Sequence, residues 1–232
     1  MRKRIADIDA PGTWPAAALE RVRQWAAQWQ GRTRYTPDIG IPLELDPSFR
    51  QLFDGYKLRA FHFTRLLDHE RALVFAQGLR PLTLDLVTDR INAAQNIGVI
   101  TETEADELRD ASVFSTGEEQ HRAGQVCLVL SRNVYQSCPD DCTPLMRQWG
   151  GEAIHNSSRT SMVSVHLLTL GKPCIVEAAI DICVQGEHRI FPAMHKAFVG
   201  RFLNFEDAGA DVFYRAPVPP ECILSINTVE LD

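Results

Sequence analysis

The chain has 232 residues, of which 45% are hydrophobic, and its formal net charge is −6. This length and composition allow a full hydrophobic core, so we expect a folded globular protein and exclude a disordered chain. The negative charge argues against broad, sequence-independent binding of nucleic acid, because neutralising phosphates needs a basic surface. A local basic groove stays compatible with this composition.

The sequence favours a soluble, cytoplasmic protein without membrane contact. Met1-Arg-Lys-Arg4 is not followed by the apolar run of a signal peptide, and the longest apolar stretches are too short to cross a bilayer. Four of the six cysteines lie in apolar runs, which is typical of reduced core residues. Cys138 and Cys142 flank a polar turn, but no second pair at zinc-site spacing accompanies them, so we predict no metal site.

The N-terminal part, residues 1–57, is expected to be a helix and an extended linker packed on the core. Thr13 is a suitable N-cap before Trp14-Pro15. Apolar residues then recur at helical spacing up to Gly31, at Leu19, Val22, Trp25, Ala26 and Trp29. This pattern predicts an amphipathic helix that docks on its own core, with a partner surface as the alternative. Three prolines in residues 35–47 indicate the linker.

Residues 58–232 mix helices and strands in irregular order, which predicts an α+β fold. Expected strands are 58–64, 126–130, 174–183, 211–215 and 223–229, and expected helices are 68–76, 85–94, 103–110, 144–149 and 162–170. Thr101 and Glu104 form a capping-box pattern at the third of these helices. Neither the dinucleotide-binding nor the P-loop glycine motif is present.

The strand at 58–64 carries the most informative polar pair. Because side chains alternate along a strand, His62 and Thr64 are expected on one face, and Phe61, Phe63 and Arg65 on the other. Imidazole and hydroxyl groups each donate and accept hydrogen bonds, so this pair can hold ribose hydroxyls or a carboxamide. A core histidine satisfied by the backbone is the alternative.

Two short motifs give the chain a family resemblance. Phe61-His-Phe-Thr-Arg65, followed by a helix and Gly78-Leu-Arg-Pro81, resembles the ADP-ribosyltransferase superfamily, in which an H-x-T strand leads into a helix ending in G-L-x-P. Within that superfamily, the motifs are most similar to those of DarT-type toxins and RNA 2′-phosphotransferases. Asp211-Val-Phe-Tyr-Arg-Ala-Pro-Val-Pro-Pro-Glu221-Cys-Ile is similar to the closing strands of that superfamily, where V-P-P-E-x-I introduces the last strand.

The resemblance implies a catalytic domain over residues 58–232, with two small mixed or antiparallel sheets flanked by helices and NAD bound in a cleft as substrate. In that arrangement His62 contacts the ribose next to nicotinamide and Thr64 lies beside it. Arg65 is a candidate for the diphosphate, although strand alternation places it opposite His62. Tyr135 is the candidate aromatic residue that faces nicotinamide.

Cleavage of the nicotinamide bond passes through a transition state with oxocarbenium character, so the site needs a carboxylate. Glu152 is the first candidate, because Gly151 lets the backbone approach a ligand closely and Trp149 supplies an aromatic ring nearby. Asp211 is the second, since it precedes the V-P-P-E segment where the family has a glutamate. A solvated position is the alternative for each acid.

We therefore expect an NAD-dependent ADP-ribosyltransferase that acts as a toxin or effector on a macromolecule, with a protein acceptor slightly favoured over nucleic acid. An antitoxin or partner protein is a further expectation. The alternatives are an NAD glycohydrolase or RNA 2′-phosphotransferase on the same fold, and a binding module that kept the fold without catalysis.

Overall fold

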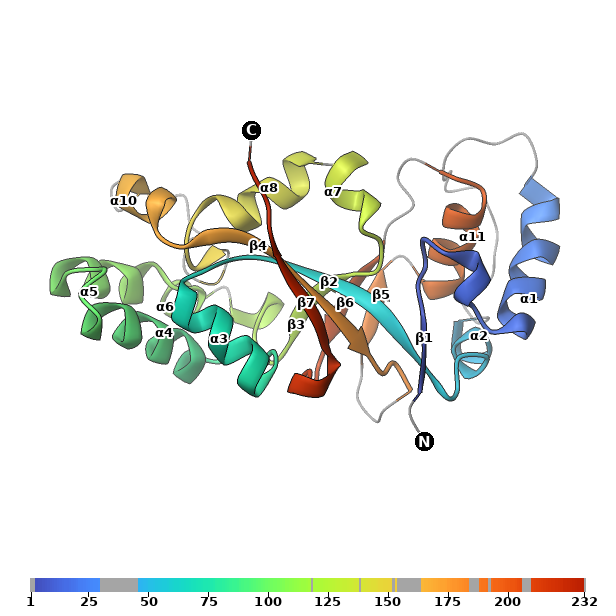
Figure 1. The fold of residues 1–232 in the computed structure, drawn as a ribbon, viewed down its shortest axis with the longest axis horizontal. Coiled ribbons are helices and arrows are strands. Elements are labelled where there is room, and N and C mark those ends of the chain that lie inside the picture. The colour runs from blue at the N-terminus through green and yellow to red at the C-terminus, as the bar shows by residue number, and fades with distance from the viewer. Residues whose placement is uncertain are drawn as a thin grey trace. The chain divides into compact units, whose positions relative to one another are not determined.

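The computed structural model describes residues 3–29, 46–117, 119–137, 139–151, 153, 164–183, 188–191, 193–205 and 210–231. Within them the chain forms a mixed α/β fold with a seven-stranded sheet. Figure 1 shows the ribbon with its helices and strands labelled. The strands are β1 (Arg4–Ala6), β2 (Tyr56–Leu66), β3 (Val126–Val129), β4 (Lys172–Ile180), β5 (Arg189–Phe191), β6 (Asp211–Tyr214) and β7 (Ile223–Thr228).

The described strands belong to one hydrogen-bonded sheet in the order β5-β6-β3-β2-β4-β7, with β1 paired to β2 outside this path. β1 runs parallel to β2, whereas β2 pairs antiparallel with β3 at Phe61 and Val129. The mixture of helices and strands is confirmed, but the described strands do not separate into the two small sheets that were predicted. The reason is that β2 and β4 have 11 and 9 residues and bond to neighbours on both sides.

The chain divides into two compact units made of interleaved segments. The first unit contains Met1–His62, Cys127–Pro139 and Glu177–Tyr214, and the second contains Phe63–Val126, Asp140–Val176 and Arg215–Asp232. Strands β2, β3 and β4 therefore contribute residues to both units.

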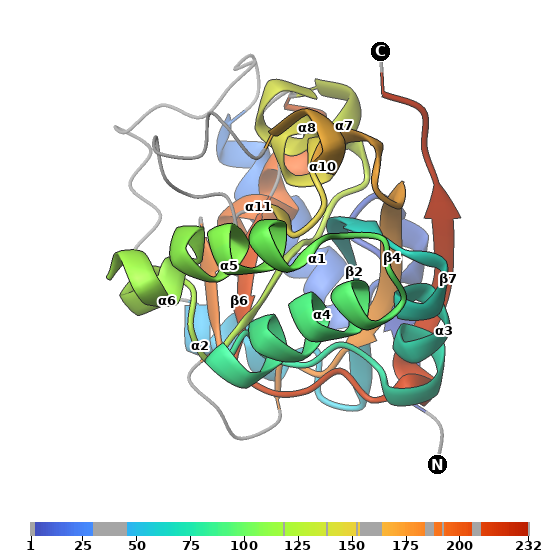
Figure 2. The ribbon, with the colours of Figure 1, turned by 90° about the vertical axis from the view of Figure 1, so that its left-hand side faces the viewer.

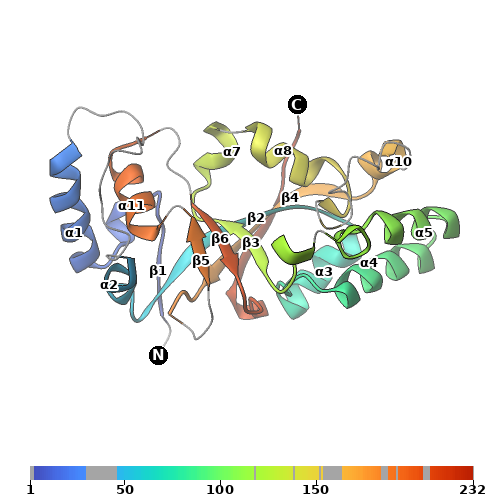
Figure 3. The same cartoon turned by 180° about the vertical axis from the view of Figure 1, so that it is seen from behind.

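The described residues of the first unit form four α-helices in addition to strand segments. These are α1 (Ala16–Ala26), α2 (Asp46–Gln51), α7 (Asn133–Ser137) and α11 (Met194–Phe202). Helices α1 and α11 lie side by side, and α2 lies close to them (Figure 1). Seen from behind, β5 and β6 form an antiparallel pair in this unit (Figure 3).

Aromatic rings fill the helical part of the first unit. The centroid of the Phe198 ring lies 4.7 Å from Trp14, 5.6 Å from Phe49 and 5.0 Å from Phe53. Trp25 on α1 reaches Phe49 at 5.3 Å. Rings at these separations gain from edge-to-face geometry in addition to their buried area. The apolar face of the predicted N-terminal helix therefore docks on its own unit.

The second unit contains helices α3 (Asp68–Gln77), α4 (Leu84–Asn96), α5 (Glu102–Ala111), α6 (Val113–Thr116), α8 (Pro139–Arg147) and α10 (Ser164–Thr169). Helices α4 and α5 run next to each other in Figure 2. Their apolar faces bury Val87, Ile91, Ala105 and Leu108 in a cluster that also contains Trp149. The capping box at Thr101 and Glu104 is present, as predicted.

Several local expectations need correction. Thr13 does not cap α1, because its hydroxyl donates to the carbonyl of Ala10 and accepts from the amide of Asp7, and the helix begins at Ala16. Helix α8 begins at Pro139, so Pro144 lies inside it. Strands β1 and β5 and helices α2 and α11 were not predicted. Glu152 and the segment 154–163 lie outside the described residues.

Candidate functional site

His62 lies on the part of β2 that belongs to the first unit, and its ring is held by the neighbouring strand. Its Nδ1 is 2.8 Å from the carbonyl oxygen of Cys127. A carbonyl only accepts, so Nδ1 carries the proton and, in the neutral ring, Nε2 is an acceptor. His62 and Thr64 are half-buried, whereas Phe61, Phe63 and Arg65 are buried, which agrees with the predicted alternation. The ring of His62 is thus held by a backbone carbonyl of β3, as expected for the alternative of a core histidine satisfied by the backbone.

The two motifs that carried the family resemblance contact each other in the second unit. Leu79, directly after α3, donates its amide to the carbonyl of Val218 at 2.9 Å, and the amide of Val218 donates to the carbonyl of Leu79 at 2.8 Å. Gly78 has φ of +81° and ψ of −163°, and a Cβ at this position would lie 1.9 Å from the Val218 oxygen. Glycine is therefore required by the close approach of the two segments.

Arg65 lies in the second unit and is tied to the ends of two helices. Its Nε donates to the carbonyl of Leu170 at 2.5 Å, and Nη1 reaches the carbonyls of Met146 and Arg147 at 3.3 and 3.5 Å. These residues end or directly follow α8 and α10, whose last carbonyls lack partners inside the helix. Burial lowers the pKa of Arg65 below its ordinary range. Two of its three nitrogens are thereby fixed to backbone oxygens.

Trp149 is fully buried and belongs to the core of the second unit. Its Nε1 donates to Oε2 of Glu70 at 2.8 Å, the guanidinium of Arg90 donates to Oε1 at 2.7 Å, and the amide of Leu67 donates to Oε2. Burial alone would raise the pKa of Glu70, but the charge and hydrogen bond of Arg90, with the other donors, bring the pKa below its ordinary value. This buried carboxylate connects the start of α3 with α4 and Trp149.

The remaining predicted residues are distributed over both units. Tyr135 is half-buried on α7, and Asp211 is exposed as the first residue of β6, both in the first unit. Gly151 is in the second unit with φ of +51°, and a Cβ there would meet the carbonyl oxygen of Leu145 at 3.3 Å. The positive φ at this position favours glycine for the turn after α8.

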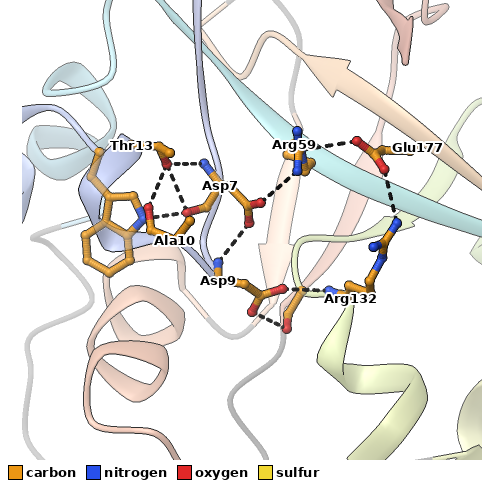
Figure 4. A network of polar contacts seen from close by, with 9 residues as sticks. Asp7, Asp9, Ala10, Thr13, Arg59, Arg132 and Glu177 are labelled. Atoms are coloured by element: carbon orange, nitrogen blue, oxygen red, sulfur yellow. Dashed lines mark hydrogen bonds and ion pairs between the residues drawn. The ribbon is translucent and has the colours of Figure 1, made fainter. Parts of the chain in front are cut away.

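A polar network in the first unit, drawn in Figure 4, was not predicted from the sequence. The guanidinium of Arg59 on β2 is 3.1 Å from Asp7 and 3.2 Å from Glu177, and Arg132 is 3.3 Å from the other Glu177 oxygen. Asp9 accepts from the Ser131 hydroxyl at 2.7 Å. Each of the three carboxylates has cationic or hydroxyl partners, so the arrangement fastens the N-terminal strand and turn to the unit. The one sequence signal for this network is the position of Arg59, a charged residue within an alternating strand.

The described part of the chain has no helix long and apolar enough to span a membrane. Within the same residues, no group of three or more histidine, cysteine, aspartate or glutamate side chains is arranged to hold a metal ion. Comparison of the sequence and structure with models of known families, with curated proteins and with solved structures gives no match.

Proposed function

We propose that the protein is an NAD-dependent ADP-ribosyltransferase that modifies a macromolecule. The observation that carries the proposal is the pairing of its two family-like motifs. Gly78-Leu79 and Val218 are about 140 residues apart in the chain, yet they exchange two backbone hydrogen bonds. Strand β2, which carries the start of the first motif, holds the half-buried ring of His62 through the carbonyl of Cys127. Motifs that resemble one superfamily and also pack together support that resemblance better than either motif alone.

The chemistry breaks the bond between C1 of the nicotinamide ribose and the nicotinamide nitrogen. Nicotinamide leaves with the bonding electrons, a nucleophile of the acceptor forms the new bond to C1, and the nucleophile loses its proton. In the proposal His62 and Thr64 bind the nicotinamide ribose, Glu152 is the carboxylate that stabilises developing positive charge, and Asp211 is the second candidate. Tyr135 stays a candidate for contact with nicotinamide.

One feature of the second unit favours the binding-module alternative. The ring of Trp149 is fully buried and its Nε1 donates to Glu70, so this side chain is not available to NAD in the way the sequence suggested. The choice between an enzyme and a binding module therefore depends on the carboxylate.

The test measures NAD binding by calorimetry and nicotinamide release by chromatography, with and without cell extract as a source of acceptor. Glu152→Gln is expected to abolish release while binding persists, Asp211→Asn is expected to reduce release less, and Glu107→Gln serves as the control. Release without acceptor would indicate a glycohydrolase. Binding without release would indicate the binding module, and absence of NAD binding would remove the enzyme proposal.

A further inference from the structure

Arg65 borders an open hollow of about 600 Å³ that lies entirely in the second unit. The hollow, called here the Arg65 hollow, is lined by Arg65, Arg147, Leu168, Pro173, Val229, Glu230 and Leu231. Its volume is within the range of about 300–1,000 Å³ that is usual for small-molecule sites. It combines two guanidinium groups, one carboxylate and four apolar side chains.

The charge of Arg65 is the unusual feature of this hollow. The side chain is 9% exposed, and its hydrogen bonds go to three backbone carbonyls. Among the described residues, no carboxylate forms an ion pair with Arg65, and its Nη2 donates no hydrogen bond. A buried charge without a counter-charge is costly, and helix-end carbonyls supply only partial negative charge. An anion in the hollow would complete the neutralisation.

The guanidinium of Arg65 is also preorganised. Because Nε and Nη1 are fixed by the ends of α10 and α8, the group cannot rotate freely, and a ligand that binds it loses little side-chain entropy. Arg147 contributes a second guanidinium from an exposed side chain that makes no ion pair within the described part of the chain. Two such groups suit a phosphate, which carries up to two negative charges and accepts planar, bidentate hydrogen bonds.

We propose that the Arg65 hollow binds a phosphate monoester of a small hydroxylated molecule of about mononucleotide size. The phosphate contacts the guanidinium groups of Arg65 and Arg147. The organic part packs against Leu168, Pro173, Val229 and Leu231, and the carboxylate of Glu230 accepts a hydrogen bond from a hydroxyl group. The proposal does not depend on NAD chemistry, since only one lining residue, Arg65, which the sequence offered for the NAD diphosphate, is also a candidate for ADP-ribosyl transfer.

The segment that follows β7 lines one side of the hollow, and the amide of Val229 in it donates to the carbonyl of Pro173 at 3.0 Å. Val229, Glu230 and Leu231 are therefore placed by a backbone contact with the start of β4, and a bound ligand should stabilise this segment. Protection of these amides from hydrogen exchange is a readout that a nonspecific surface anion would not produce.

The test is a titration at low ionic strength with AMP, adenosine and inorganic phosphate as separate probes, followed by calorimetry. We expect AMP to bind more tightly than phosphate, and adenosine to bind at least tenfold more weakly than AMP. Arg147→Gln should weaken AMP binding by about fivefold, the size of a partly exposed charge contact. Glu230→Gln removes a negative charge that repels phosphate. The affinity for inorganic phosphate should therefore be unchanged or higher in this variant.

The matched control is Arg80→Gln, which removes an exposed arginine of the same unit that pairs with Asp89 at 3.8 Å and does not line the hollow. It should leave AMP affinity unchanged. Arg65→Lys keeps the charge but cannot hold both helix ends, so Arg147→Gln is the decisive variant if Arg65→Lys fails to fold. Equal AMP affinity in wild type and Arg147→Gln would overturn the proposal, as would equal binding of adenosine and AMP.

Discussion

Replacing Gly78 by alanine tests the contact between the two family-like motifs. An added Cβ would lie 1.9 Å from the carbonyl oxygen of Val218 and 2.9 Å from the carbonyl carbon of Pro219, so the two segments must separate. The backbone of Gly78, with φ of +81° and ψ of −163°, lies in a region that costs a residue with a Cβ about 1–3 kcal/mol. Separation also breaks the two hydrogen bonds between Leu79 and Val218, each contributing about 1 kcal/mol.

We therefore expect Gly78→Ala to lower the free energy of unfolding by about 4 kcal/mol, which for a chain of this length lowers Tm by roughly 10 °C. Gly98→Ala is the control, because Gly98 also has a positive φ, +74°, but no atom lies within 4 Å of an added Cβ. It should cost only about 1 kcal/mol. Thermal and urea unfolding of both variants give the comparison. Equal losses in the two variants would refute the described approach of Gly78 to Val218.

Two further predictions concern the buried carboxylate of Glu70. Its pKa is lowered from the ordinary value of 4.5, so its ionised form stabilises the fold above about pH 4.5, and this contribution is lost as pH falls below that value. Glu70→Gln should thus show a flatter loss of stability between pH 5 and 3, measured by urea unfolding at each pH, and an unchanged slope would contradict the assignment. Trp149→Phe keeps an aromatic ring but removes the donor to Glu70, which should cost about 1–3 kcal/mol. Trp25→Phe, whose ring packs against Phe49, is its control, and an equal loss in both variants would show that packing rather than the hydrogen bond is responsible.

Elements that depend on neighbouring residues in the chain could be predicted from the sequence. The strand around His62, helix α3 with its stop at Gly78, and the capping box of Thr101 and Glu104 follow from alternation, glycine conformation and side-chain capping. These signals act over a few residues, so they are readable without the fold. The short strands β1 and β5 carry too few residues for a pattern, and they form because a neighbouring strand supplies their partners.

The sequence by itself determined that His62 and Thr64 share one face of a strand and that glycine stands at residue 78. Only the tertiary structure decided which groups these residues contact. His62 contacts the carbonyl of Cys127, and Gly78 lies against the carbonyl of Val218. The tertiary structure also decided that Arg65 is held by two helix ends and that Trp149 is buried against Glu70. The physical reason is that partners far apart in the chain are set by packing and by the satisfaction of buried polar groups, which leave no local pattern in the sequence.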